Sequence, residues 1–392
     1  MPSAGTNSFK TYEAVGNRED LSDIISNISP TDTPFVSRAG KSKADATYHE
    51  WQTDELAAPA ANAHLESEEA DIAQSAPTTR LGNYTQIFQK TCSVSGTQEV
   101  VRKAGRASEM AYQMIKRGKE LNKDIELAML SNQAKSAGDA SNARKLRGLP
   151  SWIATNLSAG AGGSAGDATH AYTPGTPRAL TEDMVMDVIQ KGYENGANFD
   201  AIMVAPAVKV IISKTFGGTG DRVTQYRQQT SKTAGTTIAV YQSDFGNFDI
   251  IPNRVMHNAT GGLDLQKYLF LIDFSMVSVA TLRPVKSVTL AKTGDNEKRM
   301  LVTEKTLVVK NEKGLGMVAD IDVTADYSAK STAVTATITS SAAAPIYTSA
   351  AVSNESLPVT VTSSAGSPVY TSTVVSNTTD NPVPTQAVTP GG

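Results

Sequence analysis

Residues 95–131 read SGTQEVVRKAGRASEMAYQMIKRGKELNKDIELAMLS, and this stretch decides the fold. Its apolar and small residues recur in alternating steps of three and four, which places them on one face of a helix. They are Val100, Ala104, Ala107, Ala111, Met114, Gly118, Leu121, Ile125 and Ala128. Ser95 and Gln98 have the spacing of a capping box, which marks a helix start. The stretch therefore predicts one long helix of roughly 50 Å.

Two interpretations of this helix fit the pattern. One is a coiled-coil strand, but Gly105 and Gly118 would each cost about 1 kcal/mol, and the sequence has no second heptad segment. The other is a spine helix that carries sheets on either side, which we prefer. Charged residues, among them Lys116, Lys119 and Glu126, fill much of its remaining surface.

The composition limits the class of protein. The chain has 392 residues, enough for two or three domains, with 40% hydrophobic residues and a formal net charge of -3. That charge argues against a nucleic-acid binder held by bulk charge, although a local basic patch is compatible with it. Cys92 is the single cysteine, so no internal disulfide forms. We see no secretory signal and no apolar run of about 18 residues, so no membrane span is expected.

Before the helix, the sequence predicts a long hairpin. Residues 46–56 (ATYHEWQTDEL) are expected to form a strand, and residues 80–94 its return. The connection at 57–79 is acidic, with Glu66, Glu68 and Glu69 close together. An isolated two-stranded ribbon is marginal in water, so we expect it to lie on a neighbouring subunit. An ordinary solvated loop is the alternative.

After the helix, short helices and strands are mixed without regular alternation. Thr181 is expected to begin a helix that Gly196 ends, and Pro206 to begin another. Strands are expected at 199–205, 236–241, 248–251, 268–272, 276–282, 287–290, 299–309 and 315–321. The expected fold class is therefore α+β.

The last 69 residues, 324–392, have a different composition. They contain four charged residues and are rich in Ser, Thr, Ala, Val and Pro. The segment PIYTSAAVSN at 345–354 returns 23 residues later as PVYTSTVVSN, with seven of ten positions identical. Each copy carries one tyrosine, Tyr347 or Tyr370, and predicts a short β-forming unit. An extended arm that runs over neighbouring subunits and a flexible surface fringe are both compatible with this composition.

Side chains with catalytic or metal-binding patterns are not found. The four histidines are scattered without ligand spacing. Cys92 lies in a strand pattern, where a small buried hydrophobe is the expected role. The glycines at 217–220 lack the Lys-Ser/Thr of a phosphate-binding loop. We therefore expect a structural protein with no catalytic residues, no cofactor and no metal.

Several segments resemble the major capsid proteins of tailed bacteriophages. They are residues 18–25 (REDLSDII), 29–35 (SPTDTPF), 48–51 (YHEW) and 304–314 (EKTLVVKNEKG). The order of arm, hairpin, long helix and mixed sheets resembles the Hong Kong 97-type capsid fold over about residues 17–322. The C-terminal tail lies outside the resemblance and would be a β-rich extension.

The resemblance implies a division of the chain. An N-terminal arm would span 1–40, an extended loop hairpin 41–95, the spine helix and part of a peripheral domain 96–180, an axial domain 181–282, peripheral strands 283–323 and a C-terminal arm 324–392. No helical scaffolding region precedes Ser8, so scaffolding is expected from another chain. The lysine–asparagine crosslink of the founding member cannot be placed here.

The resemblance also implies a function. The chain would form hexamers and pentamers of an icosahedral shell around phage double-stranded DNA, assembling in the host bacterial cytoplasm and residing in the virion. Expected partners are other copies of the chain, a separate scaffolding protein, a portal, a cement or decoration protein, and packaged DNA through weak non-specific contacts; no membrane is expected. The hypothesised assembly contacts are Phe35, Trp51, Glu66, Glu68, Glu69, Tyr347 and Tyr370. The alternative is a bacterial surface or adhesion protein with a Thr/Ser-rich stalk.

Overall fold

The computed structural model divides the chain into two units, Met1–Asp326 and Tyr327–Gly392. The structure describes residues 31–69, 77–103, 105–216, 240–257 and 264–325, and the backbone of 347–348 and 370–371. Residues 18–25, which carry part of the resemblance, and the glycines at 217–220 lie outside the described residues. The predicted boundaries inside the first unit remain predictions.

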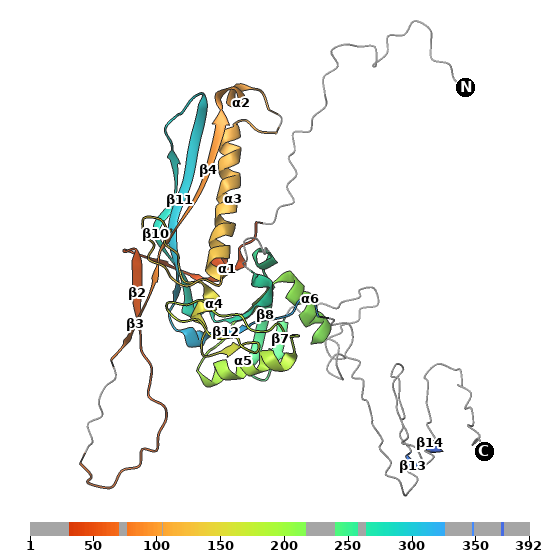
Figure 1. Cartoon of the computed structure of the whole chain (residues 1–392). Coiled ribbons are helices and arrows are strands. Elements are labelled where there is room, and N and C mark those ends of the chain that lie inside the picture. Colours follow the sequence, from red (N-terminus) through yellow and green to blue (C-terminus); the bar gives the residue numbers. More distant parts are fainter. Residues whose placement is uncertain are drawn as a thin grey trace, which may run out of the picture. The chain divides into compact units, whose positions relative to one another are not determined.

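A long four-stranded sheet forms one part of the first unit (Figure 1). Its strands run in the order β1 (Gly40–Lys43), β10 (Val277–Thr289), β11 (Asn296–Val309) and β4 (Gln86–Ser95). β1 is parallel to β10, and β11 is antiparallel to both of its neighbours, β10 and β4. Strands from the first hundred residues therefore enclose a hairpin from the last hundred residues of this unit.

Helix α3 (Glu109–Leu130) lies along this sheet beside β4 and β11 (Figure 1). Leu121 and Ile125 are buried there, as the periodicity predicts. The sequence predicts sheets on either side of the helix. Instead α3 packs on one face of one sheet, and Ile115 and Lys119 on its other side are exposed.

The prediction of one continuous helix over residues 95–131 is wrong. The chain forms α2 (Gly96–Val100), leaves the helix at Val101 and enters α3 at Glu109. Gly105 has φ of 72°, a left-handed conformation that interrupts a right-handed helix.

Both helix starts have their own caps. The Ser95 side chain accepts the Gln98 N–H, as the capping pattern predicts, and Ser108 caps α3 by accepting the Ala111 N–H at 3.2 Å. The Glu99 carboxylate adds to the second cap, because it accepts the N–H groups of Glu109 and Met110 at 3.0 and 3.2 Å. Two helices, each with its own cap, therefore replace the single helix that the sequence predicts.

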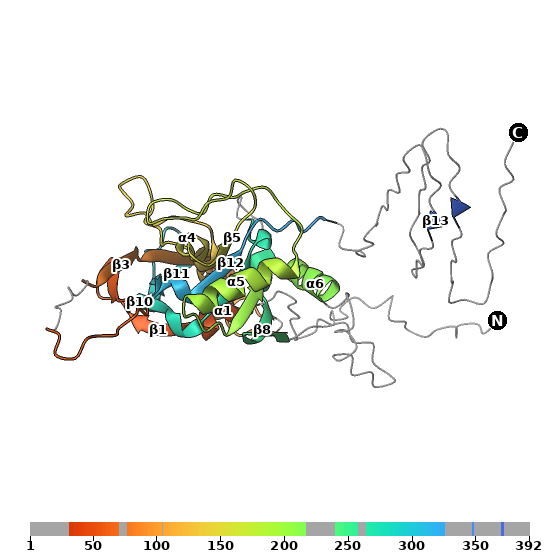
Figure 2. The same cartoon turned by 90° about the horizontal axis from the view of Figure 1, so that it is seen from below.

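A second sheet of six strands forms the other part of the unit. Its order is β5 (Leu157–Ser158), β12 (Leu315–Val318), β9 (Leu269–Ile272), β6 (Ala201–Val204), β8 (Gly246–Pro252) and β7 (Val240–Ser243). All residues of β6, β9 and β12 are buried, so these strands form the core. Helices α5 (Glu182–Glu194) and α6 (Pro206–Thr215) lie beside this sheet (Figure 2).

The helix boundaries predicted at Pro206 and Gly196, beside the second sheet, are confirmed. Pro206 begins α6, and Val208 and Ile212 face the core. Gly196 follows the end of α5 with φ of 82°, a conformation that favours glycine. The short helical pieces elsewhere are α1 (Pro34–Arg38), α4 (Leu149–Trp152), η1 (Arg254–His257), η2 (Leu265–Lys267), η3 (Phe274–Met276) and η4 (Glu312–Gly314).

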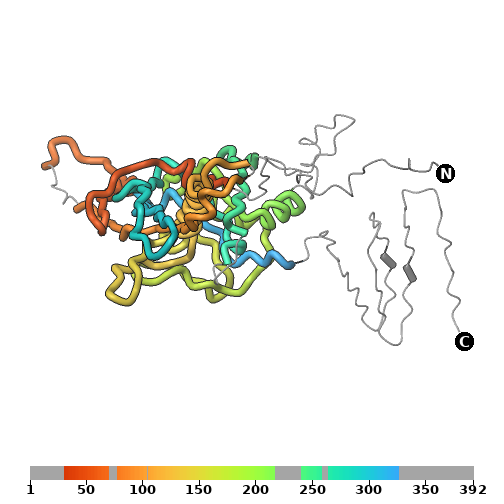
Figure 3. The backbone as a smooth tube through the Cα atoms, turned by 90° about the horizontal axis from the view of Figure 1, so that it is seen from above, coloured from red at the N-terminus to blue at the C-terminus, as the bar shows by residue number. Residues whose placement is uncertain are grey.

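The predicted hairpin is a two-stranded ribbon that projects from the unit (Figures 1 and 3). β2 (Tyr48–Thr53) pairs antiparallel with β3 (Thr79–Tyr84). The return strand predicted at 80–94 is therefore divided, because the chain bends at Thr85 and continues as β4 in the four-stranded sheet. Only the first part of the predicted return belongs to the ribbon.

The described part of the second unit is a pair of short strands. β13 (Tyr347–Thr348) and β14 (Tyr370–Thr371) are parallel, with Tyr347 opposite Tyr370. The two copies of the 23-residue repeat thus pair with each other at equivalent positions, and each contributes a short strand as predicted.

Candidate functional site

One face of the ribbon root is held by aromatic rings and a lysine. The rings of Tyr48 and Tyr84 lie 4.6 Å apart, on β2 and β3. The Lys135 ammonium donates to the Tyr48 hydroxyl at 2.8 Å and to the Gly82 carbonyl at 3.3 Å. Gly82 is needed there, because a Cβ would lie 2.7 Å from the Tyr48 ring. This face therefore fixes both strands to the body of the subunit.

The other face of the ribbon root carries Trp51, one of the hypothesised assembly contacts. Its half-buried ring lies 5.6 Å from the ring of Trp152 and packs against a small cluster that includes Ala280 and Val308. The Arg147 guanidinium stacks 4.2 Å above the Trp152 ring, and burial lowers the pKa of Arg147 to about 10. The structure thus places Trp51 against its own chain, where it orients the ribbon.

The bend between the ribbon and the sheet is a buried polar network. The Thr85 N–H donates to the Thr47 carbonyl at 2.8 Å, and its hydroxyl donates to Glu304 at 2.7 Å. Glu304 also receives the guanidinium groups of Arg144 and Arg283, the latter at 2.8 Å. The Arg144 Nε donates to the Thr85 carbonyl at 2.6 Å. Because the N–H, carbonyl and hydroxyl of Thr85 and both oxygens of Glu304 have partners, the ribbon leaves the sheet in a defined direction.

Beyond this root, the ribbon exposes apolar and acidic side chains. Leu56 is 99% exposed and Leu65 is 80% exposed, and the hypothesised contacts Glu66, Glu68 and Glu69 lie on the same exposed connection. Glu68 accepts the Leu65 N–H at 2.9 Å, which shapes a local turn. The described part of this connection therefore has almost no core of its own.

Phe35 is enclosed by its own chain. Its ring is fully buried and lies 6.4 Å from the ring of Phe274. The N–H groups of Phe35 and Val36 donate to the two carboxylate oxygens of Glu126 at 2.9 and 2.8 Å, and the Asn253 amide donates to the same group at 2.7 Å. These bonds fix the start of the short helix α1, which contains Phe35, to α3.

Glu126 was missed by the sequence analysis, which counts it among the surface charges of the helix. It is fully buried, and burial raises its pKa above the ordinary value of 4.5. The one available signal is its position between Ile125 and Met129, in the most apolar part of the stretch. Glu304 and Arg144 were also missed, because the sequence does not reveal that they meet across 160 residues.

The face of the long sheet opposite α3 is partly apolar. Leu301 is buried toward α3, so its neighbours Met300 and Val302 point to the other face. Val288 pairs with Met300 on that face and is 39% exposed, and Lys286 pairs with Val302. This outer face therefore combines half-buried apolar side chains with a lysine.

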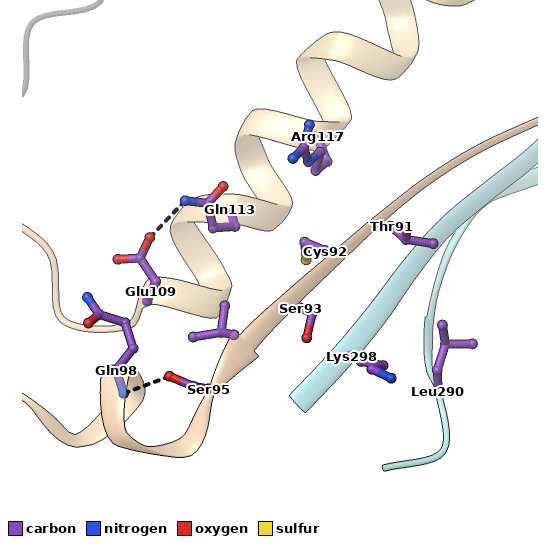
Figure 4. Close-up of a pocket in the computed structure, with 11 residues that line it drawn as sticks. Thr91, Cys92, Ser93, Ser95, Gln98, Glu109, Gln113, Arg117, Leu290 and Lys298 are labelled. Atoms are coloured by element: carbon purple, nitrogen blue, oxygen red, sulfur yellow. Dashed lines mark hydrogen bonds between the residues drawn. The ribbon is translucent and has the colours of Figure 1, made fainter. Parts of the chain in front are cut away.

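A groove of about 720 Å³ lies between the start of α3, the end of β4 and the start of β11 (Figure 4). Cys92 lines it, and its thiol lies 3.5 and 3.4 Å from the sulfur atoms of Met110 and Met114. Burial raises the pKa of the Cys92 thiol, which therefore stays protonated at neutral pH. The residue is half-buried rather than fully buried, and it packs as a small apolar side chain.

No group of three or more His, Cys, Asp or Glu side chains among the described residues could hold a metal ion. Within the same residues, no helix is both long and apolar enough to cross a membrane. Of Tyr347 and Tyr370, only the backbone pairing is described.

A protein-family model and a curated relative agree on the kind of protein that this chain resembles. A family model described as SU10 major capsid protein matches residues 4–322. The major capsid protein of Escherichia phage Phieco32 is 30% identical over 348 residues, which cover 79% of this chain and 96% of that protein.

Solved structures share the fold at low sequence identity. The capsid of a native GTA particle has a TM-score of 0.54 at 11% identity, over 79% of this chain and 96% of its own. The capsid of cyanophage A-1(L) has a TM-score of 0.53 at 12% identity, over 80% and 98% of the two chains. A structure from Mycobacterium phage Cain gives 0.51 at 14% identity, over 81% and 100%. The α+β, Hong Kong 97-type fold is therefore confirmed.

Proposed function

The chain belongs to the SU10 major capsid protein family, and on that premise we propose that it forms hexamers and pentamers of an icosahedral shell enclosing double-stranded phage DNA. It is a major capsid protein of a phage virion, and its family is one of structural proteins rather than enzymes. We propose assembly in the host bacterial cytoplasm, with a separate scaffolding protein and a portal, and with a decoration protein as a further partner.

The projecting ribbon is the observation that carries this proposal. Its root is fixed to the body on both faces, whereas its tip exposes Leu56 and Leu65 almost completely. A rigid root holds the apolar tip away from the body and exposed to water. That exposure is unfavourable unless another molecule covers the tip. Every copy has the same ribbon, so each copy can contact the next one in the same way. Such head-to-tail contacts form a closed ring when the rotation between neighbouring copies divides a full turn evenly. Hexamers and pentamers are such rings.

We propose that the receiving surface is the outer face of the long sheet on a neighbouring copy. That face offers Met300 and Val302 to the exposed leucines of the tip. Lys286 on the same face, and Lys292 in the turn that follows β10, would meet the acidic tip. Exposed ion pairs contribute about 0.2–1 kcal/mol each, but a shell repeats each contact many times.

Electron microscopy of the purified full-length chain, with and without scaffolding protein, tests the proposed function. Closed shells or ring-shaped capsomers are expected. A stable monomer at high concentration in the presence of scaffolding protein would contradict the proposal.

Charge reversal tests the tip contact. Replacing Glu66, Glu68 and Glu69 with lysine should lower shell yield and shell melting temperature while leaving the subunit fold intact. The neutral glutamine triple variant is the matched control and should have a smaller effect. Adding Lys286→Glu and Lys292→Glu to the lysine variant should restore assembly. Unchanged yield and melting in the lysine variant would mean that the tip is a solvated loop.

We also propose that the C-terminal segment 324–392 is an extended arm that cements neighbouring subunits. Its low charge and its paired repeat copies support this role. Truncation after Asp322 should give shells that form but melt earlier. Shells of unchanged melting temperature, together with free proteolytic removal of the tail from intact particles, would favour a surface fringe instead.

A further inference from the structure

The side of α3 that faces away from the sheet carries a row of lysines. Lys116, Lys119 and Lys123 follow one another at steps of three and four residues, so they lie on one face of the helix. Met110 and Leu121 lie on the opposite face, where they are buried toward the sheet. Lys116 and Lys119 are exposed and Lys123 is half-buried. We call these three residues the lysine row.

The acidic residues near the lysine row have other partners. Glu120 lies four residues after Lys116, but its carboxylate pairs with Arg117 at 2.6 Å. Asp124 pairs with Lys90 at 2.7 Å, on the side of the sheet. Two further acidic groups, Glu109 and Glu126, pair with Arg106 and with backbone N–H groups. Within the described residues, no carboxylate lies within ion-pair distance of the row, which therefore keeps its positive charge.

This arrangement is unfavourable in the isolated subunit. Lys119 and Lys123 are four residues apart, and like charges at that spacing destabilise a helix. The acidic residue between them in sequence, Glu120, pairs with Arg117 instead of with either lysine. A negatively charged partner would relieve the repulsion.

We propose that the lysine row binds the sugar–phosphate backbone of double-stranded DNA and marks the face of the subunit that lies toward the shell interior. This inference rests on the proposed function, because it identifies the surface that would meet the enclosed DNA. The row extends over about 10 Å of helix axis, and each strand of duplex DNA carries one negative charge per about 3.4 Å. One subunit therefore meets several phosphates along one strand.

The overall charge of the chain does not oppose this binding. The net charge is -3, but charges farther away than about 8–10 Å are largely screened at physiological ionic strength. Contacts to phosphate oxygens also carry no base specificity, which suits a surface that meets DNA of any sequence.

An acidic segment of a neighbouring copy is the rival partner for the lysine row. Lysine is depleted in protein–protein interfaces, where ammonium groups must lose their water. Phosphate contacts use lysine as a point charge in a wet interface. The row has three lysines and no arginine fork aimed at a carboxylate, so DNA is the better partner.

A salt titration with full-length capsomers tests the proposal. Binding of a fluorescein-labelled duplex is followed by anisotropy for wild type, for K116Q/K119Q/K123Q and for the control K41Q/K145Q/K214Q, which removes the same charge from exposed lysines elsewhere. The slope of log K against log salt should fall by up to about 2.7 for the row variant, at about 0.9 for each lost phosphate contact. The control should keep the wild-type slope.

Two outcomes would overturn the proposal. Equal loss of slope in both variants would mean that bulk charge, not the row, binds DNA. Unchanged DNA binding combined with failed assembly of the row variant would identify a protein partner.

Particles provide a second readout that separates this proposal from the proposed function. In DNA-filled shells, formaldehyde should crosslink DNA to Lys116 and Lys119 in preference to Lys41. The opposite preference would overturn the proposed orientation. If the wild-type chain formed no shells but the row still bound DNA with the expected slope, the proposed function would fail and the binding surface would stand.

Discussion

The anchor between α1 and α3, at Glu126, gives a quantitative prediction. Replacing Glu126 with glutamine keeps the shape of the side chain but substitutes an amide for one carboxylate oxygen. The Val36 N–H, now 2.8 Å from that oxygen, would face an NH₂ group instead of an acceptor. The Phe35 N–H and the Asn253 amide would keep an uncharged acceptor.

The expected loss follows from these three bonds. A hydrogen bond to a charged group contributes about 1.5–3 kcal/mol, and a neutral one about 0.5–1.5 kcal/mol. The variant also avoids the desolvation of the carboxylate, which offsets part of the loss. We expect Glu126→Gln to lower the free energy of unfolding by about 2 kcal/mol. Glu126→Ala should cost about 4 kcal/mol, because it leaves all three donors without a partner and opens a cavity.

Urea unfolding of the soluble subunit and hydrogen exchange at the Phe35 and Val36 amides measure the effect. Glu120→Gln on the same helix is the matched control, since Glu120 forms only a surface ion pair with Arg117. That control should shift stability by less than about 1 kcal/mol. Equal shifts for the Glu126 and Glu120 variants, with unchanged exchange at Phe35, would refute the assignment of Glu126 as the anchor.

The same residue predicts a pH dependence. Burial raises the pKa of Glu126, so the folded chain holds this proton more tightly than the unfolded chain does. Its contribution to stability is fully present below pH 4.5 and is lost as the pH rises through the folded-state pKa. The advantage of wild type over Glu126→Gln should therefore narrow as the pH rises through that window.

Three further substitutions test other contacts. Glu304→Gln removes the charge of a buried carboxylate that pairs with two arginines, and it should lower the free energy of unfolding by about 3 kcal/mol. The urea midpoint measures this loss. A change below about 1 kcal/mol would mean that the bend does not depend on this charge. Gly82→Ala places a Cβ 2.7 Å from the Tyr48 ring and should speed hydrogen exchange in the ribbon while the second sheet stays protected, and unchanged exchange would contradict a fixed root. Tyr172→Phe removes the 2.5 Å hydrogen bond to the buried Asp320 carboxylate. It should lower the free energy of unfolding by about 1.5–3 kcal/mol. An unchanged free energy of unfolding would show that the N–H groups of Gly160 and Gly175, which also donate to Asp320, are sufficient.

Local signals made part of the fold predictable. Proline at the start of α6 and glycine after α5 act within a few residues of their own position, and both helices are found where the sequence predicts them. The strands β6 and β9 follow from similar short-range patterns. The resemblance to phage capsid proteins supplied the overall fold, which is confirmed.

Features that depend on distant residues were not predictable in this way. The break at Gly105 depends on Glu99, whose carboxylate caps the next helix after a loop rather than continuing the first. The bend at Thr85 depends on Glu304, more than 200 residues away in sequence. A periodic pattern records which side of an element is apolar, but it does not record which element will cover that side.

The strand order of the long sheet also determines when the subunit can fold. β4 is complete once Ser95 has been made, but its partner begins at Asn296. At about 5–20 residues per second, a ribosome needs about 10–40 s to synthesise the intervening stretch of about 200 residues. Throughout that time β1, the ribbon and α3 have no sheet to join, so the nascent chain cannot present a finished ribbon root. Each subunit can therefore assemble only near the end of its own synthesis. A copy that is still being synthesised cannot yet bind a finished copy through its ribbon.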